Sequence, residues 1–318
     1  MSDIYLHHYP RSPFSEKIRL ILGYKKLAWK SVRVPDIMPK PDVLALTGGY
    51  RRTPFLQVGA DIYCDTALIC DVLEHLHPAP GLYPAHQKGL ARILAQWADD
   101  KLFWAAMAYN LQPKGAAQMF GQGRPPEEWQ NQAKAFAEDR SKMRLGLPRL
   151  PAADATAAYR SYLRRINTML EGQDYLLGSA PCVADFSVYH PLWFTRTQSS
   201  VMADILDATP AVLAWMDRMA AIGHGQATPS NAAESIAACA HSNFADSLFG
   251  HEVFQDEHGI ALGSEVTIAA DTFGPEPTQG TLISATRMHY TLRRTDERAG
   301  VVQVHFPRIG FIMKRVEA

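Results

Sequence analysis

The sequence predicts three consecutive structural parts: an α/β unit, an all-helical region and a small β-rich C-terminal segment. Strand and helix signals alternate through the first eighty residues. From about residue 82 to 222 strand signals are absent and helix-forming stretches follow one another, which indicates a separate helical domain. From Gly263 onward, Gly and Pro separate short β segments. We therefore expect an α/β domain at 1–79, a helical domain at 85–225 and a β-rich extension at 242–318.

The α/β unit has the predicted order β-α-β-α-β-β-α. Short apolar runs closed by Pro or Gly mark its strands, and apolar residues at helical spacing mark its helices. This order resembles thioredoxin more than a doubly wound sheet. The expected strands are 4–9, 29–34, 55–58 and 62–64, and the expected helices begin at Pro13, Pro39 and Ala67.

The helical domain begins after Pro78-Ala79-Pro80-Gly81, the clearest linker in the chain. Helices are expected at 87–110, 127–145, 153–170, 184–195 and 211–221, with one more at 227–241. In the extension, the punctuation by Gly and Pro predicts a small all-β barrel or sandwich. Its expected strands are 265–269, 280–284, 288–293, 301–306 and 311–316.

Composition and charge narrow the classes of function. The 318 residues include 32 Lys and Arg and 32 Asp and Glu, so we expect no nucleic-acid surface and no electrostatic membrane anchor. No apolar stretch approaches the roughly 18–20 residues that span a bilayer. The N-terminus lacks the basic and apolar segments of a secretory signal. We expect a cytoplasmic protein without nucleic-acid or membrane partners.

Cysteine and histidine spacing predicts neither disulfides nor a metal site. There is no Cys-x-x-Cys pair among the four scattered cysteines, Cys64, Cys70, Cys182 and Cys239. We expect reduced thiols. His7 and His8 are neighbours on a strand and point to opposite faces, while His75 and His77 diverge on a helix.

Four short motifs carry the chemical signal. They are Tyr9-Pro10-Arg11-Ser12-Pro13-Phe14-Ser15-Glu16-Lys17, Thr53-Pro54-Phe55-Leu56, Asp65-Thr66 and residues 180–186. The first resembles the first strand, loop and helix of cytosolic glutathione S-transferases, in the Ser-Pro-Phe form of the tau and omega branches. The others match the superfamily's cis-proline loop, its acidic-Ser pair and the capping box of its helical domain. The resemblance covers residues 3 to 222, and the β-rich extension has no counterpart in a standard member.

The resemblance implies a fold with a thioredoxin-like domain followed by the helical glutathione transferase domain. It also implies an enzyme that takes glutathione as cosubstrate, without a metal, and conjugates it to small hydrophobic electrophiles. A homodimer is the family expectation. One alternative is another glutathione-dependent reaction, namely isomerisation, dehalogenation or ether cleavage. The other is a noncatalytic glutathione transferase-like interaction protein whose function resides in the extension.

Ser12 is the residue that we expect to stabilise the glutathione thiolate. A free thiol has a pKa of about 8.5, and only the thiolate is a competent nucleophile. A hydroxyl at a helix start can donate to the sulfur, where helix amides also favour negative charge. Ser12 directly precedes Pro13, which suits a first helical turn. Ser15 and Tyr9 are the alternatives, and a plain N-cap is the other interpretation of Ser12.

Thr53, Pro54, Asp65 and Thr66 are the expected glutathione-binding residues. By the resemblance, Thr53 and Pro54 present backbone groups to the cysteinyl part. A hydroxyl and free amides at a helix start suit the γ-glutamyl carboxylate, and the acid suits its ammonium group. The family often has Val in place of Thr53 and usually Ser in place of Thr66. A simple helix cap is the alternative for Asp65 and Thr66.

The second substrate is expected between the two domains, beside the helix from Gln87. Phe14 is the substrate-binding candidate, and further candidates for an apolar wall are Phe103, Trp104, Met107 and Tyr109. Plain core is the other interpretation of these aromatics. Arg51 and Arg52 are candidates for the glycyl carboxylate, although adjacent loop arginines are more often solvated.

Three further positions are interpreted as structural. Asp185 is expected to cap a core helix, with Cys182 in place of the family's Ser or Thr. His305 and Arg308, in the extension, are interpreted as exposed charges at a sheet edge, with contact to a ligand or partner as the alternative.

Overall fold

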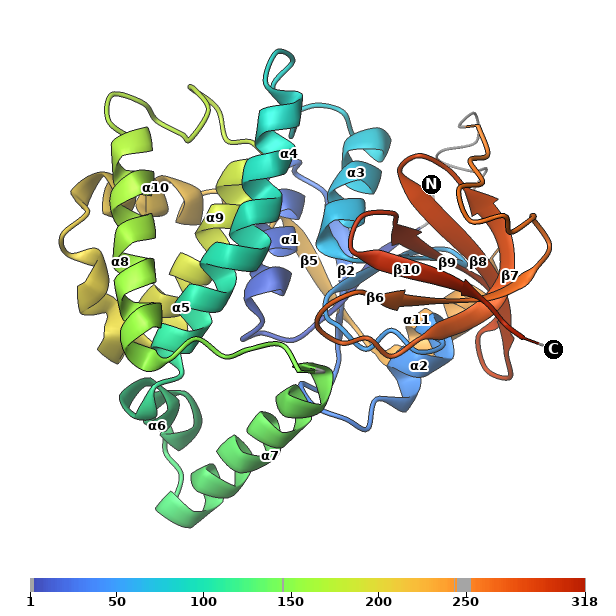
Figure 1. Cartoon of the computed structure of the whole chain (residues 1–318), viewed down its shortest axis with the longest axis horizontal. Helices are drawn as coiled ribbons and strands as arrows, with labels where there is room; N and C mark the ends of the chain where they lie inside the picture. The colour runs from blue at the N-terminus through green and yellow to red at the C-terminus, as the bar shows by residue number, and fades with distance from the viewer. Residues whose placement is uncertain (1–2, 145, 243, 245–252, 318) are drawn as a thin grey trace.

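The computed structural model describes residues 3–144, 146–242, 244 and 253–317. The helical domain lies at one side, the β-rich extension at the other, and the α/β unit between them (Figure 1). The strands are β1 (Ile4–His8), β2 (Ala28–Arg33), β3 (Phe55–Val58), β4 (Asp61–Cys64), β5 (Gln226–Ser230), β6 (Glu265–Ala270), β7 (Thr278–Ala285), β8 (His289–Asp296), β9 (Gly300–Pro307) and β10 (Phe311–Arg315). They form one sheet in the order β10-β6-β7-β8-β9-β4-β3-β1-β2-β5.

The α/β unit has the predicted thioredoxin-like arrangement. β1 pairs parallel with β2 and antiparallel with β3, and β3 pairs antiparallel with β4. Its helices are α1 (Pro13–Tyr24), α2 (Pro41–Thr47) and α3 (Thr66–Leu76). Side chains alternate across the sheet, so Leu56 contributes to one core and its neighbour Phe55 to another. The sheet therefore has two buried faces.

The helical domain covers the first of these faces. Its helices are α4 (Lys88–Trp97), α5 (Phe103–Asn110), α6 (Pro113–Gly121), α7 (Pro126–Arg144), α8 (Ala152–Met169), α9 (Val183–Trp193) and α10 (Pro210–Ala220). A π-helical turn at Ala98–Leu102 joins α4 to α5, and the segments Phe194–Gln198 and Ser200–Leu206 follow α9. Leu145, the last residue of a predicted helix, lies outside the described residues.

The predictions missed α6. Gly115 within it faces the Asn110 carbonyl so closely that a Cβ would lie 2.0 Å from that oxygen. Only glycine allows this approach, although glycine weakens the local helix signal.

Asp185 has the structural role that was predicted. Its carboxylate accepts hydrogen bonds of 2.9 Å from the Leu176 and Cys182 amides and from the Trp215 indole. Asp185 and Trp215 are fully buried. The carboxylate therefore joins the start of α9 to α10 inside the first core.

The β-rich extension is confirmed, and its strands continue the α/β sheet. β6 to β10 pair antiparallel with one another, and β9 pairs parallel with β4, with Ile62 opposite Val304. Apolar residues of β6, β7 and β9 then meet Phe55, Ile62 and Cys64 in the second core. The extension thus covers the face of the α/β unit that the helical domain leaves open. Residues 245–252, at the start of the predicted extension, lie outside the described residues.

At the opposite edge of the sheet, beside β2, the predicted helix is shorter than expected and a strand precedes it. The predicted helix at 227–241 is α11 (Ala232–Ala240), because residues 226–230 instead form β5, which pairs parallel with β2. Pro229 within this strand is compatible with an edge position, where one side of the strand needs no hydrogen bonds.

The interpretation of His305 as an exposed edge charge is wrong. His305 is 7% exposed, stacks on Tyr63 and donates to the Asp61 carboxylate over 2.8 Å. Its other ring nitrogen lies 2.9 Å from the Thr291 hydroxyl. Arg308 is also mostly buried and donates to the Thr286 carbonyl over 2.7 Å. Both side chains hold the extension together or fasten it to β4.

Candidate functional site

Three segments that carry predicted site residues meet at one end of the α/β sheet. Phe55, at the start of β3, lies opposite His7 near the end of β1 and opposite Cys64 at the end of β4. Residues 9–12, 53–54 and 65–66 directly extend these strand ends, so they lie at the same end of the sheet. The structure therefore brings together Ser12, Thr53-Pro54 and Asp65-Thr66. The Thr53–Pro54 peptide bond is cis.

Ser12 is the N-cap of α1. Its Oγ accepts a hydrogen bond of 3.1 Å from the Ser15 amide, and its backbone is extended, as a cap requires. The hydroxyl proton takes no part in this bond. Capping and donation to a ligand are therefore compatible roles for Ser12, although the residue is only 2% exposed.

The two alternatives to Ser12 differ in their partners. The Tyr9 hydroxyl accepts a hydrogen bond of 3.3 Å from Arg140 on α7. Ser15 is fully buried, and its hydroxyl has no hydrogen-bond partner within the described part of the chain.

Asp65 and Thr66 form the start of α3. The Asp65 carboxylate caps the helix by accepting from the Ala67 amide over 2.9 Å. Asp65 has a φ of 74°, a conformation that non-glycine residues adopt rarely and that clusters at functional sites. The Tyr50 hydroxyl, 3.1 Å from the Asp65 amide, helps to hold this backbone.

A buried polar network behind Thr66 was missed by sequence reasoning. Lys17 donates to the Thr66 hydroxyl over 3.1 Å and to the Asp99 carboxylate over 2.7 Å. His190 Nε2 lies 3.0 Å from the other Asp99 oxygen. The π-helical turn between α4 and α5 presents Asp99, and such irregular turns are frequent at functional sites.

In this network Lys17 and Asp99 are charged, whereas His190 is neutral. Burial disfavours the Lys17 ammonium, but the neighbouring Asp99 raises the pKa of Lys17 above its ordinary value. Burial likewise opposes ionisation of Asp99, yet Lys17 and His190 lower its pKa. Burial lowers the pKa of His190, so its imidazole is neutral at pH 7. The Lys17–Asp99 ion pair, beside the neutral His190, therefore holds the first residue of α3, Thr66, through the Lys17 hydrogen bond.

The sequence favours solvated surface charges at Arg51 and Arg52, but in the structure both side chains are largely buried. The Arg51 guanidinium is 7% exposed and lies 2.6 Å from Asp139 on α7 and 3.1 Å from Glu276 in the extension. Arg52 is 20% exposed and lies 3.5 Å from Asp65. Its Nε and Nη2 are buried without a hydrogen-bond partner in the residues that the structure describes. Arg52 thus has unused donors beside the start of α3.

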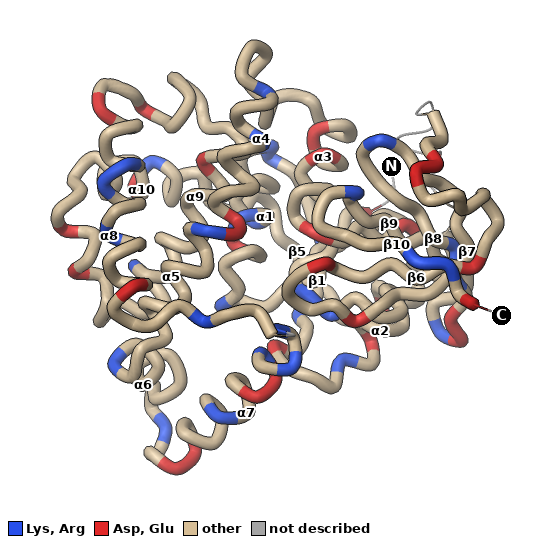
Figure 2. The backbone as a smooth tube through the Cα atoms, viewed as in Figure 1, with Lys and Arg blue, Asp and Glu red and all other residues tan. Residues whose placement is uncertain are grey.

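Figure 2 shows charges of both signs along α7. Residues in its C-terminal half contact Met38, Arg51 and Asp36 of the α/β unit. Asp139 accepts from Arg51 and from the Met38 amide, while Arg140 donates to the Asp36 carbonyl over 2.8 Å. These bonds fasten α7 to the loops around the α/β unit.

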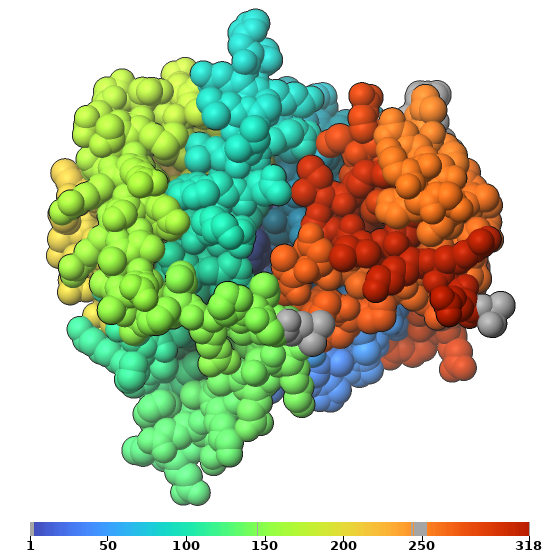
Figure 3. All heavy atoms as spheres, viewed as in Figure 1, coloured from blue at the N-terminus to red at the C-terminus, as the bar shows by residue number. Residues whose placement is uncertain are grey.

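Half-buried aromatic rings continue from Ser12 toward the helical domain. Phe14 packs at 4.7 Å from Phe103, which packs at 5.0 Å from Trp104. Met107 and Tyr109 are 7% exposed and belong to the first core, so plain core is the correct interpretation for these two. Figure 3 shows a hollow between the helical domain and the extension, with dark blue atoms of the N-terminal segment at its bottom.

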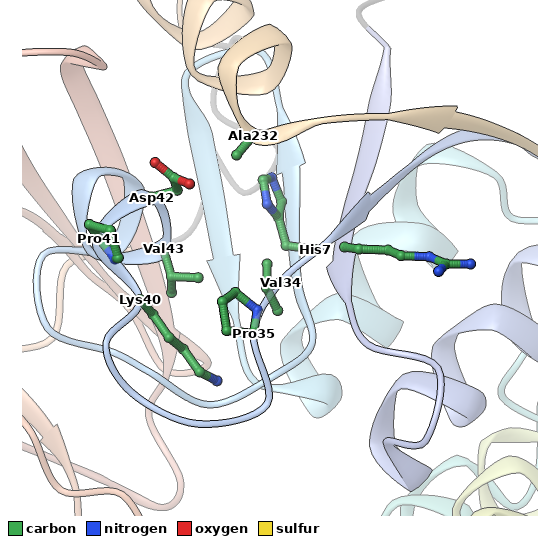
Figure 4. A pocket seen from close by; sticks show the side chains of 9 residues that line it. His7, Val34, Pro35, Lys40, Pro41, Asp42, Val43 and Ala232 are labelled. Atoms are coloured by element: carbon green, nitrogen blue, oxygen red, sulfur yellow. The ribbon is translucent and has the colours of Figure 1, made fainter. Parts of the chain in front are cut away.

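A small cavity on the other face of the sheet is distinct from this site. It holds about 30 Å³ and is lined by His7, Lys40 and Ala232, among others (Figure 4). This is room for one or two water-sized molecules and far too little for a tripeptide. Burial lowers the pKa of His7 to about 4, and burial together with nearby arginines lowers that of Lys40 to about 8.

The cysteines do not resemble nucleophiles. All four are free and buried, and burial raises the pKa of three of them, Cys70, Cys182 and Cys239, to about 12. Across the described ranges, no group of three or more His, Cys, Asp or Glu is arranged to hold a metal ion. In the same part of the chain no helix combines the length and apolar character needed to cross a bilayer.

Comparisons with known proteins agree with the observed fold. Residues 6–81 match the family described as glutathione S-transferase, N-terminal domain, and residues 129–218 match the corresponding C-terminal domain. A solved GST-like protein from Pseudomonas syringae is 39% identical, covers 99% of this chain and 100% of its own, and superposes with a TM-score of 0.82.

Two more distant relatives are informative. FtsZ-localized protein A of Caulobacter vibrioides is 26% identical over 189 residues, which are 57% of this chain and 72% of that protein. A glutathione S-transferase from Methylobacillus flagellatus, solved with glutathione bound, is 18% identical. It covers 70% of this chain and 99% of its own, with a TM-score of 0.50, and shows a shared fold. The two family matches and the Pseudomonas relative, which matches over the whole length, establish that the chain belongs to the glutathione S-transferase superfamily.

Proposed function

We propose that this protein is a glutathione transferase that binds glutathione at Ser12, Thr53-Pro54 and Asp65-Thr66 and conjugates it to small hydrophobic electrophiles. The observation that carries the proposal is the meeting of two capped helix N-termini, those of α1 and α3, at one end of the sheet. Helix N-termini favour anions. Glutathione presents two anionic groups to such a site, its thiolate and its γ-glutamyl carboxylate.

The thiolate would lie at the start of α1. Ser12 donates its hydroxyl proton to the sulfur while its oxygen accepts from the Ser15 amide. Accepting one hydrogen bond polarises a hydroxyl and strengthens the bond that it donates. Lowering the thiol pKa from about 8.5 by two units would make the thiolate predominant at pH 7.

The remaining groups would bind the peptide. The Thr66 hydroxyl and the first amides of α3 hold the γ-glutamyl carboxylate, and Asp65 holds the adjacent ammonium. Lys17, which donates to Thr66, fixes this hydroxyl in place. Thr53 offers its backbone groups to the cysteinyl part. The unused donors of Arg52 suit a carboxylate of the peptide.

The reaction is a nucleophilic displacement or addition. The thiolate sulfur attacks the electrophilic carbon and a carbon–sulfur bond forms. In a displacement, a leaving group departs with its bonding electron pair. In an addition, the electron pair of the attacked π bond moves to the neighbouring atom, which then takes a proton from solvent. The proton of the thiol has gone to solvent beforehand. Phe14, which is half-buried and lies two residues after Ser12, contacts the apolar body of the electrophile.

Calorimetry with glutathione tests the proposal. We expect micromolar-to-millimolar binding, and thiolate absorbance against pH should show a lowered thiol pKa that rises by one or two units in Ser12→Ala. Tyr9→Phe and Ser15→Ala are the matched controls and should leave the thiol pKa unchanged. If Ser15→Ala raises the pKa instead, Ser15 is the stabilising residue, and absent binding would refute the proposal.

A noncatalytic interaction protein is the second candidate. The similarity to a protein named FtsZ-localized protein A favours it, as does the small exposed fraction of Ser12. This candidate predicts no lowering of a thiol pKa. Isomerisation, dehalogenation and ether cleavage use the same bound thiolate and are separated from conjugation by product analysis. The cytoplasmic location stays a prediction from composition, and the homodimer stays a prediction from the family resemblance.

A further inference from the structure

We infer that the loop between β6 and β7, residues 271–277, completes the second-substrate site and that Phe273 selects planar aromatic electrophiles. The inference rests on the proposed function and assigns a substrate-binding role to the extension. It follows from the position of this loop, its anchoring and the rings that it meets.

The loop contacts the end of α7 and Arg52, which lies beside the proposed glutathione site. The Gly274 amide donates to the Met143 carbonyl at the end of α7 over 2.8 Å. A Cβ at Gly274 would lie 2.9 Å from the Met143 methyl carbon and 3.2 Å from Cγ of Arg52. Arg52 directly precedes Thr53-Pro54. The loop therefore spans from the helical domain to the segment that is proposed to bind the cysteinyl part of glutathione.

Both ends of the loop are held. At its start, the Asp271 amide donates to the Gly310 carbonyl over 3.1 Å. Glu276 pairs with Arg51 over 3.1 Å. Thr278, where β7 begins, donates to the Thr47 carbonyl over 3.0 Å and accepts from the Tyr50 amide over 3.2 Å. Pro275 and Pro277 restrict the backbone between these contacts. A loop that is ordered before binding adds less conformational cost to ligand binding than a free one.

Phe273 ends a row of four rings that begins beside Ser12. Its ring packs edge-on at 5.1 Å from Trp104, which continues through Phe103 to Phe14. All four rings are half-buried, so each keeps an accessible edge or face. The row joins the α/β unit, the helical domain and the extension. Atoms of the helical domain and the extension border the hollow in Figure 3.

The chemistry of the row favours a flat aromatic substrate. Aromatic rings attract one another in offset or edge-to-face arrangements, beyond the effect of buried area alone. Arg144 lies 4.5 Å above the Trp104 ring and orients it. Phe273 lies at the end of the row farthest from Phe14, after ring-to-ring steps of 4.7, 5.0 and 5.1 Å. We therefore expect a planar aromatic electrophile that extends along the row to contact Phe273, and an aliphatic electrophile of a few atoms to react at the sulfur without reaching it.

Binding of glutathione conjugates tests the inference in the full-length protein. We would measure glutathione, S-methylglutathione and S-dinitrophenylglutathione by calorimetry, and rates with chlorodinitrobenzene and iodomethane. In Phe273→Ala we expect about fivefold weaker binding of the dinitrophenyl conjugate and a similar rise in KM for chlorodinitrobenzene. Glutathione, S-methylglutathione and iodomethane should change less than twofold.

Phe254→Ala is the matched control. Phe254 is 38% exposed and precedes Gln255, which pairs with Ala285 at the far end of β7. It should change none of these values, and Phe273→Tyr should retain the preference. If Phe273→Ala affects both conjugates equally or neither, the inference is overturned while glutathione binding still supports the proposed function. If the wild type binds no glutathione, the proposed function fails and the inference falls with it.

Discussion

The two faces of the α/β sheet are covered in different ways. On the helical face, the polar groups behind the candidate site include an ion pair, Lys17–Asp99, beside the neutral His190. On the face that the extension covers, buried histidines bond mostly to neutral groups. His7 lies 2.9 Å from Gln57, and His289 lies 2.9 Å from Thr286.

This difference indicates a division of labour. A buried ion pair adds little net stability compared with apolar packing, but losing one partner is costly. Such a pair is expected where a hydroxyl such as that of Thr66 has to be held in one place. Neutral hydrogen-bonded residues instead let the second core fill with apolar side chains. The extension therefore is structural cover over most of its area, and its 271–277 loop and Phe311 contact Arg52 beside the site.

Removing the extension should have the largest effect. A chain that ends at Ser242 would expose the edge of β4 and the apolar residues Phe55, Ile62 and Cys64, which are fully buried in the complete chain. We expect loss of soluble folded protein, measured by size-exclusion chromatography and circular dichroism. A truncated chain that folds and binds glutathione normally would show that the second core is dispensable.

Asp99→Asn should have the next largest effect, on the helical face. The neutral amide leaves the fully buried Lys17 without its counter-charge, at a cost on the order of 3 kcal/mol in unfolding free energy. Glutathione affinity should fall as well, because Lys17 positions Thr66. Urea denaturation and calorimetry measure the two effects. The control is Asp217→Asn, since Asp217 is 65% exposed in its pair with Arg196 and should change stability by less than about 0.5 kcal/mol.

Mild acid should have an effect of similar size, to which two buried histidines on the extension side contribute. Burial lowers the pKa of His7 from 6.5 to about 4 and that of His289 to about 3. Because the unfolded chain then binds more protons, stability is fully present above about pH 6.5 and is lost as the pH falls through these lower values. The pKa of Asp99 is lowered from its ordinary value of 3.8, so the stability that its ionised carboxylate contributes is retained at pH values where the unfolded chain already protonates its histidines.

Urea titrations between pH 7 and pH 4 measure this loss. At about 1.4 kcal/mol per pH unit, His7 alone accounts for roughly 3 kcal/mol by pH 4. His7→Gln should flatten the profile, whereas His86→Gln, at an exposed position, should not. Equal profiles for wild type and His7→Gln would contradict the burial of a neutral imidazole.

The sequence by itself determined the features that depend on neighbouring residues. Pro13 after Ser12 marks a helix start, and the structure has Ser12 as its cap. Asp65 caps α3 in the same way. Alternation and glycine punctuation located the strands of the extension to within about three residues at each end. Capping and alternation are local, since they need only residues a few positions apart.

Only the tertiary structure decided which of these residues work together. Lys17 and Asp99 lie 82 positions apart, and His305 and Asp61 lie 244 apart. β5 exists because β2 offers a free edge, and Arg51 is buried because α7 and the 271–277 loop cover it. No local sequence pattern encodes such contacts, because a charged residue has the same sequence neighbours whether it is solvated or buried in an ion pair. Their partners are set by the packing of the whole chain, which one segment of sequence does not contain.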